Sequence, residues 1–325
     1  MNEVTIYPGS LAGEVLVPAS KSISHRAVIC AGLSEGISNI YNVGISQDIE
    51  ATIEAMRSFG TMIEKADASL RIKGSAVPKL KNSGINCHES GSTLRFIIPI
   101  AALTGEPVTF YGEGRLVERP LLQYYNIFEK QGIKYETEAG KLPLHINGRL
   151  VPGEFQLEGN ISSQFISGLM FALPLLEGDS RITVTTEPES KPYIDLTLKV
   201  LKDFSIHIEN RDYRTFVIKG RQKYRGTDYT VPGDFSQAAF WLAAGALGSE
   251  VVCKGLDINS MQGDRVMMDI IGEMGGGIFI KADAVRALPT DTRGTVIDAS
   301  QCPDLVPILA VLGALSEGRT EIVNA

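Results

Sequence analysis

Apolar runs that end at a glycine recur along the chain at a nearly constant spacing. Each run has the length of a buried helix, and a short β-rich run follows the glycine. The five glycines are separated by 69, 73, 70 and 70 residues: Gly36, Gly105, Gly178, Gly248 and Gly318. A fixed period of this size indicates that one supersecondary unit is used repeatedly.

Each repeat also contains a second helix, amphipathic in pattern, and further β-rich residues. DIEATIEAMRSFG and YIDLTLKVLKDF place apolar residues at helical spacing, and RTFVIKG is typical of a strand. Several second helices stop at a glycine that can adopt the left-handed conformation, namely Gly60, Gly132 and Gly275. The repeating unit is therefore βαβαββ, and the predicted fold class is α/β.

A chain of 325 residues exceeds what one hydrophobic core usually organises, so we expect two domains. Three units span residues 14–224, and the segment YRGTDYTVPGD then reads as a linker. A second series begins at Asp234 with one unit and the start of another, and the chain ends in the strand-like TEIVNA. We expect that this second domain is truncated; a naturally unequal pair of domains is the alternative.

Composition narrows the possible functions. A net charge of −7 argues against general affinity for nucleic acid, and no apolar stretch is long enough to cross a bilayer. The four cysteines lack CxxC spacing and the four histidines lack a ligand pattern, so we expect buried thiols in the cytoplasm and no metal. Neither GxGxxG nor a Walker motif is present, and we expect no cofactor.

The candidate chemistry lies where the first helix of each repeat begins. The five openings are rich in polar residues: PASKSISHR, ESGSTLR, GNISSQF, PGDFSQAAF and QCPDLVP. N-capping accounts for one polar residue per helix but not for clusters that include Lys21, Arg26 or Arg95. Helix N-termini attract phosphate and carboxylate, and Arg119 would add a further charge. These openings predict a site for small molecules with more than one anionic group.

These segments resemble the 5-enolpyruvylshikimate-3-phosphate (EPSP) synthases, a family of enolpyruvyl transferases. The resemblance covers nearly the whole chain, through PASKSISHRA, SGSTLR, GEGRLVERP, GNISSQF, ESKPYIDLT, PGDFSQAAF and PDLVP in the family's order. It implies an inside-out α/β barrel with two domains, each of three βαβαββ units around inner helices. It also implies that residues 1–13 join 225–325 in the second domain, with 14–224 forming the first.

The resemblance implies transfer of enolpyruvyl from phosphoenolpyruvate to the 5-hydroxyl of shikimate 3-phosphate, a step of aromatic amino-acid biosynthesis, by a monomeric enzyme. The residues implied for shikimate 3-phosphate are Lys21, Ser22, Arg26, Ser162, Ser163, Gln164, Ser190, Tyr193 and Asp304. Those implied for phosphoenolpyruvate are Lys21, Gly91, Arg119 and Gln164. Lys21 and Asp304 are the implied catalytic residues.

Asp304 matches the family's general base, which would take the proton of the attacking hydroxyl. An ionised carboxylate can serve because an alcohol is a poor nucleophile until a base accepts its proton. Without the resemblance, an N-cap role for Asp304 would be the simpler interpretation. Arg95 is expected to be structural and ion-paired beneath the site, and the resemblance implies that Asp48 and Asp234 fall at acidic positions near the family's cleft.

The chain departs from the family in two places. Glu89 stands where many members have asparagine, and a carboxylate there would repel a phosphate unless it is turned away or paired. The family's later lysine, glutamate and arginine motifs do not occur before Ala325. We therefore expect weak binding at best and negligible turnover by these 325 residues.

Two other functions remain as alternatives. The sibling transferase for UDP-N-acetylglucosamine has Lys-Asn at its first helix and a reactive cysteine, whereas this chain has Lys21-Ser22 and no cysteine near GEGRLVERP. A non-catalytic binding fragment is the second alternative.

Overall fold

The computed structural model describes residues 3–7, 9, 11–281 and 283–325. The chain divides into two compact units, each described separately below. The large unit comprises Ala19–Val231, and the small unit comprises Met1–Pro18 together with Pro232–Ala325.

The division lies a few residues from the boundaries that the sequence predicted. Strand β1 (Gly13–Leu16) pairs in parallel with β14 (Val251–Lys254), so these residues belong to the small unit. Strand β13 (Tyr229–Thr230) pairs in parallel with β2 (Ile37–Tyr41), so the end of the expected linker belongs to the large unit. The boundary residues on both sides are thus assigned to a unit by the strand with which they pair, and the periodicity of the sequence does not reveal such pairing.

Three four-stranded sheets with one shared pattern form the outside of the large unit. Their orders are β13-β2-β4-β3, β5-β6-β8-β7 and β9-β10-β12-β11. In each sheet the first pair is parallel and the next two are antiparallel. The remaining strands are β3 (Met62–Ala66), β4 (Ser69–Lys73), β5 (Gly84–Asn86), β6 (Val108–Tyr111), β7 (Lys134–Glu138), β8 (Lys141–Asn147), β9 (Glu154–Leu157), β10 (Ser180–Val184), β11 (Ile208–Arg211) and β12 (Thr215–Ile218). The identical pairing agrees with the repeat period.

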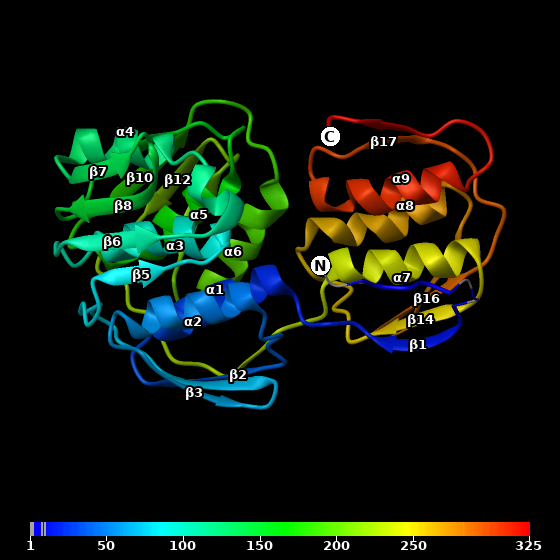
Figure 1. The fold of residues 1–325 in the computed structure, drawn as a ribbon, viewed down its shortest axis with the longest axis horizontal. Coiled ribbons are helices and arrows are strands. Elements are labelled where there is room, and N and C mark those ends of the chain that lie inside the picture. The colour runs from blue at the N-terminus through cyan, green and yellow to red at the C-terminus, as the bar shows by residue number, and fades with distance from the viewer. Residues whose placement is uncertain (1–2, 8, 10, 282) are drawn as a thin grey trace. The chain divides into compact units, whose positions relative to one another are not determined.

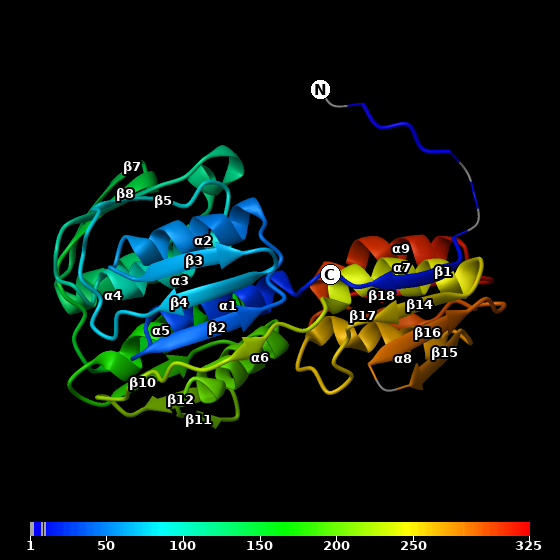
Figure 2. The same cartoon turned by 90° about the horizontal axis from the view of Figure 1, so that it is seen from below.

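Helices fill the interior of this unit, as Figures 1 and 2 show for α3 and α5. Its six α-helices are α1 (Lys21–Gly32), α2 (Gln47–Arg57), α3 (Gly91–Ala101), α4 (Leu122–Gln131), α5 (Ser163–Ala172) and α6 (Lys191–Asp203). Almost every residue of α3 and α5 is buried, and most residues of both helices are apolar. Phe96 and Phe171 meet edge to face with ring centroids 5.3 Å apart.

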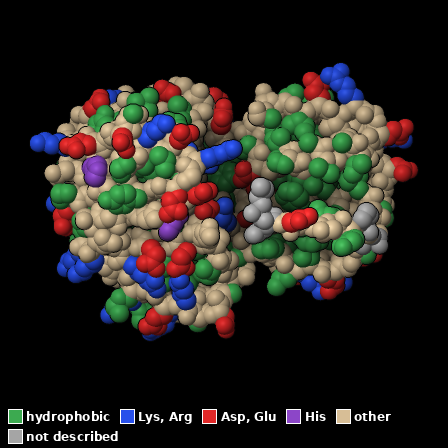
Figure 3. All heavy atoms as spheres, in the orientation of Figure 1, with side chains coloured by type: hydrophobic (Ala, Val, Ile, Leu, Met, Phe, Trp, Pro, Cys, Tyr) green, Lys and Arg blue, Asp and Glu red, His purple; other side chains and the backbone are tan. Residues whose placement is uncertain are grey.

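The small unit repeats the same sheet pattern once, in the order β1-β14-β16-β15, with β15 (Gly277–Lys281) and β16 (Ala284–Leu288). Helices α7 (Phe235–Leu247), α8 (Met267–Glu273) and α9 (Val306–Ala314) accompany it. Strand β18 (Glu321–Val323), from the segment TEIVNA, pairs in parallel with the earlier β17 (Val296–Asp298). Hydrophobic side chains gather on one face of this unit (Figure 3), and Phe240 on α7 is 49% exposed.

Two further expectations are met. Gly60, Gly132 and Gly275 have φ values of +89°, +69° and +86°, the left-handed conformation that ends a helix. The four cysteines are buried and free. In the part of the chain that the structure describes, none of the helices combines the length and apolarity needed to cross a bilayer.

Candidate functional site

Two arginines meet at the start of α3. Gly91 is the first residue of this helix, and Ser90 caps it by accepting a hydrogen bond from the backbone N–H of Thr93 at 3.2 Å. A Cβ atom at Gly91 would lie 2.8 Å from Nη1 of Arg119 and 3.7 Å from Nη1 of Arg95. Both guanidinium groups therefore lie beside free N–H groups at a helix N-terminus, an arrangement that favours anions.

The predicted ion pair of Arg95 is wrong. Among the described residues no carboxylate forms an ion pair with Arg95 or Arg119. Nη1 of Arg95 instead donates to Oε1 of Gln164 at 2.7 Å, the guanidinium lies 5.0 Å from the ring centroid of Phe165, and its Nε is buried without a partner in the described chain. Burial, followed by the charge of Arg119, lowers the pKa of Arg95. Neither of these two like charges is paired with a carboxylate of the described residues.

Gln164 joins this group from α5. Its Nε2 donates to Oγ of Ser92 at 2.9 Å, while Ser162 caps α5 by accepting from the backbone N–H of Gln164 at 3.3 Å. Ser163, the first residue of α5, is buried. The structure thus brings Gly91, Arg119 and Gln164 together, as the resemblance implied for one ligand.

A second group surrounds Arg26 on α1. Arg26 is 2% exposed and donates to Oγ1 of Thr197 at 2.8 Å and to the backbone oxygens of Ser22 at 2.7 Å and Tyr193 at 3.0 Å. Burial lowers its pKa to about 10. The backbone oxygen of Ser190, which has a φ of +55°, accepts from the N–H of Tyr193 at 3.1 Å. Four of the residues implied for shikimate 3-phosphate therefore lie together.

Lys21 begins α1 and forms an ion pair with Asp48 in the first turn of α2. The Nζ–Oδ2 distance is 3.0 Å, with side-chain exposures of 57% and 32%. Asp48 therefore faces the predicted site through Lys21. Glu89, the residue that departs from the family, directs its side chain to Gly114, where an added Cβ would lie 2.7 Å from Cδ of Glu89.

A buried polar chain, which the sequence analysis missed, joins the first three helices. Nδ1 of His25 lies 2.7 Å from Oγ1 of Thr52, which lies 2.7 Å from Oγ1 of Thr93, which in turn lies 2.7 Å from Oγ of Ser90. Burial lowers the pKa of His25 to about 3, so this histidine is neutral. Its signal in the sequence was a histidine inside an apolar helix.

The small unit contributes Asp234 and Asp304, and also Asp264, which the sequence analysis did not select. Asp234 caps α7 by accepting from the backbone N–H of Ser236 at 2.9 Å. Asp304 lies within the short 3₁₀ helix η4 (Pro303–Leu305), whose N-cap is Cys302, so the N-cap interpretation of Asp304 is wrong. Asp264 is 6% exposed, and burial followed by the charges of Asp304 and Asp234 raises its pKa to about 7.

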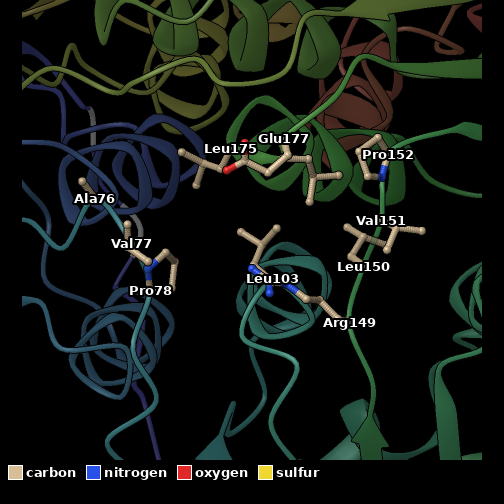
Figure 4. A pocket seen from close by; sticks show the side chains of 11 residues that line it. Ala76, Val77, Pro78, Leu103, Arg149, Leu150, Val151, Pro152, Leu175 and Glu177 are labelled. Carbon is tan, nitrogen blue, oxygen red and sulfur yellow. The ribbon is translucent and has the colours of Figure 1, made fainter.

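A hollow of about 370 Å³ lies elsewhere in the large unit. Leu103 and Leu175, just beyond the C-terminal ends of α3 and α5, line it together with Arg149 (Figure 4). Gly91 and Gln164 lie at the opposite ends of the same two helices. Since none of the predicted site residues lines this hollow, it is separate from the anion site. No group of three or more potential metal ligands occurs among the described residues.

Outer sheets of one repeated pattern around buried helices define an inside-out α/β protein, and cationic groups at its helix starts form a candidate anion site. The sequence profile of the family described as "EPSP synthase (3-phosphoshikimate 1-carboxyvinyltransferase)" matches residues 6–325. The chain belongs to this family, and it is an enzyme of the transferase class.

Individual relatives agree with this assignment. The chain is 54% identical to a 3-phosphoshikimate 1-carboxyvinyltransferase of Clostridium kluyveri over 325 residues, which is the whole chain and 76% of the relative. A Clostridium novyi protein of the same name is 53% identical over 334 aligned positions, covering the whole chain and 77% of that protein. These names do not favour the alternative that acts on UDP-N-acetylglucosamine.

Solved structures share the fold. EPSP synthase from Acinetobacter baumannii superposes with a TM-score of 0.83 at 24% identity, covering 97% of this chain and 74% of that one. The enolpyruvyl transferase NikO from Streptomyces tendae gives a TM-score of 0.75 at 19% identity, covering 96% and 75%. At these identities the comparison shows the fold alone, and it confirms the predicted inside-out architecture.

Proposed function

We propose that the protein transfers the enolpyruvyl group of phosphoenolpyruvate to the 5-hydroxyl of shikimate 3-phosphate and releases phosphate. The observation that carries this proposal is the pair of guanidinium groups, Arg95 and Arg119, at the start of α3, with no carboxylate paired to either in the described part of the chain. Two neighbouring like charges at a helix start favour the binding of an anion between them. Phosphoenolpyruvate carries both a phosphate and a carboxylate.

In this proposal Gly91, Arg119, Gln164 and Lys21 bind phosphoenolpyruvate. The glycine leaves room for the Arg119 guanidinium at the helix start, and Arg119 and Lys21 supply positive charge. Arg95 orients Gln164 through its 2.7 Å hydrogen bond. Preorganised donors of this kind stabilise the charge that develops during group transfer.

Shikimate 3-phosphate binds in this proposal to the group around Arg26. Its ligands are Lys21, Ser22, Arg26, Ser162, Ser163, Gln164, Ser190, Tyr193 and Asp304. Arg26 is already held by three hydrogen bonds, so its position is fixed before the ligand arrives. Asp304 acts as the general base that removes the proton of the 5-hydroxyl, and Lys21 assists as a cation beside the reacting groups.

Calorimetric titration of the chain with each substrate tests the proposal. We expect Arg119→Ala to weaken phosphoenolpyruvate binding about 10-fold or more, because a lost charged hydrogen bond costs roughly 1.5–3 kcal/mol. It should leave affinity for shikimate 3-phosphate nearly unchanged. Arg115→Ala is the matched control, since Arg115 is an exposed arginine four residues earlier in η1 (Gly114–Glu118).

Two results would count against the proposal: failure of both substrates to bind, or equal phosphoenolpyruvate affinity of Arg119→Ala and the unmodified chain. Phosphate release, measured in the same samples, tests the separate expectation that these 325 residues turn over negligibly. That expectation stays a prediction.

We further propose that the protein works in the cytoplasm as a monomer. Its four reduced, buried cysteines suit a reducing compartment. Sedimentation at several protein concentrations would test the oligomeric state, and a concentration-dependent mass would contradict the monomer.

A further inference from the structure

Three aspartates from three elements lie near the start of α7 in the small unit. Asp234 caps α7, Asp264 lies in the 3₁₀ helix η3 (Gly263–Val266), and Asp304 lies in η4. Both 3₁₀ helices pack against α7. Gln262 ties the segment before η3 to this end of α7, since its Oε1 accepts from the N–H of Phe235 at 3.0 Å and its Nε2 donates to the backbone oxygen of Gly233 at 2.9 Å.

Asp264 is the most deeply buried of the three. Its side chain is 6% exposed, and its Oδ1 has no hydrogen-bond partner in the described part of the chain. Asp234, by contrast, uses its Oδ1 to accept from the N–H and the hydroxyl of Ser236, at 2.9 and 2.5 Å. A buried carboxylate with one oxygen left without a partner is costly when ionised and much less so when it carries a proton.

No cation among the described residues compensates this carboxyl group. The charged or titratable groups that the packed elements supply are Asp234 at the start of α7, Asp304 and Cys302 at η4, and Asp269 and Glu273 on α8. Arg265, the next residue in η3, forms no ion pair with any of the described residues. Only Asp304 and Asp234 act on Asp264 strongly enough to raise its pKa, and burial acts more strongly than either.

The charges of Asp304 and Asp234 repel an ionised Asp264, and a proton on Asp264, the most buried of the three, relieves this repulsion at the smallest cost. We propose that Asp264 is a positioning residue that holds a proton in the folded protein and so keeps the neighbouring Asp304 ionised, ready to accept the hydroxyl proton of the acceptor substrate. The inference rests on the proposed function, in which Asp304 is the general base.

The proposal has a direct consequence for pH. The pKa of Asp264 is raised to about 7, so this carboxyl group loses its proton as the pH rises through neutrality. The new negative charge then lies near Asp304, whose own charge is one of the causes that raise the pKa of Asp264. Asp264 donates no proton to substrate in this scheme; it sets the charge beside the base.

Carbon-13 NMR of the aspartate carboxyl groups in the full chain tests this coupling. We expect the Asp264 signal, assigned through the backbone, to titrate near pH 7. In Asp304→Asn it should titrate at lower pH, because a repelling charge is gone. Asp269→Asn is the matched control: it removes an equal charge from an exposed position on α8 and should leave the Asp264 midpoint unchanged.

A midpoint near the ordinary value of an aspartate would overturn the proposal, as would identical Asp264 midpoints in Asp304→Asn and the unmodified chain. Calorimetry with both substrates separates the two proposals: an ordinary Asp264 titration with intact binding overturns only this inference, whereas a coupled titration without any binding overturns only the proposed function.

Discussion

Replacing Gly168 with alanine should destabilise the large unit, although alanine is the better helix former. Gly168 lies in α5 where it crosses α3, and an added Cβ would collide with the Tyr124 hydroxyl and the backbone oxygen of Arg95. That hydroxyl donates to the same oxygen at 2.5 Å, so neither atom can move aside without breaking the contact.

The net change in stability depends on which of two opposing energies is larger. Alanine in a helix interior gains about 1 kcal/mol over glycine, while an added methyl group in a tight core costs about 1–3 kcal/mol. Because one obstacle is backbone, we place the cost in the upper part of that range and expect a net loss of about 1–2 kcal/mol. The same displacement should separate Gln164 from Arg95 and weaken phosphoenolpyruvate binding.

Gly272→Ala is the matched control. Gly272 also lies inside a helix, α8, but an added Cβ there meets nothing within 4 Å. We expect this variant to be more stable by about 0.5–1 kcal/mol. Urea-dependent hydrogen exchange, read peptide by peptide in α5 and α8, reports the free energy of opening in each unit. A Gly168→Ala protein at least as stable as the unmodified chain would refute the argument from close packing.

Three further predictions concern charge. Because the pKa of His25 is lowered to about 3, the unfolded chain binds a proton before the folded protein does, and the free energy of unfolding falls as the pH drops below about 6.5. In chemical denaturation His25→Gln should lose less stability than the unmodified chain, by up to about 1.4 kcal/mol per pH unit, and an equal loss in both proteins would contradict this. The pKa of Asp264 is raised from 3.8 to about 7, so the folded state holds the proton and the free energy of unfolding falls as the pH rises between these values. Asp264→Asn should therefore become more stable relative to the unmodified chain as the pH rises from about 5 to about 8, and a stability difference that does not change with pH would rule this out. The partly exposed ion pair of Lys21 with Asp48 stabilises the fold little, so Asp48→Asn should change the free energy of unfolding by less than about 1 kcal/mol. The same variant should bind phosphoenolpyruvate more tightly in calorimetry, because a carboxylate that competes for Lys21 is gone. Weaker binding would show that Asp48 helps to hold the ligand.

Much of the architecture could be read from the sequence because each repeat buries similar residues at similar places. The glycine period located the first helix of each unit, and alternating residues such as those of RTFVIKG located strands. The polar helix openings pointed to an anion site for the same reason: a helix start attracts anions wherever it occurs.

Contacts between residues far apart in sequence could not be read in this way. The partner of Arg95 is the amide of Gln164, 69 positions later, and the sequence offered no reason to prefer it over a carboxylate. The pairing of β1 with β14 joins segments more than 230 residues apart, so the observed unit boundary differs from the one predicted from the sequence. Nothing in the sequence around Asp264 distinguishes it from an exposed loop aspartate, whereas the structure shows that it is buried.

The sequence by itself determined the repeating unit, the helix openings and the family, since these depend on local pattern and on ordered motifs. Only the tertiary structure decided which charges are compensated. Arg95 and Arg119 share one helix start and Lys21 has Asp48, whereas Oδ1 of Asp264 has no hydrogen-bond partner in the described part of the chain. The physical reason is that the energy of a charge depends on its distance to other charges and to water, and chain folding sets both.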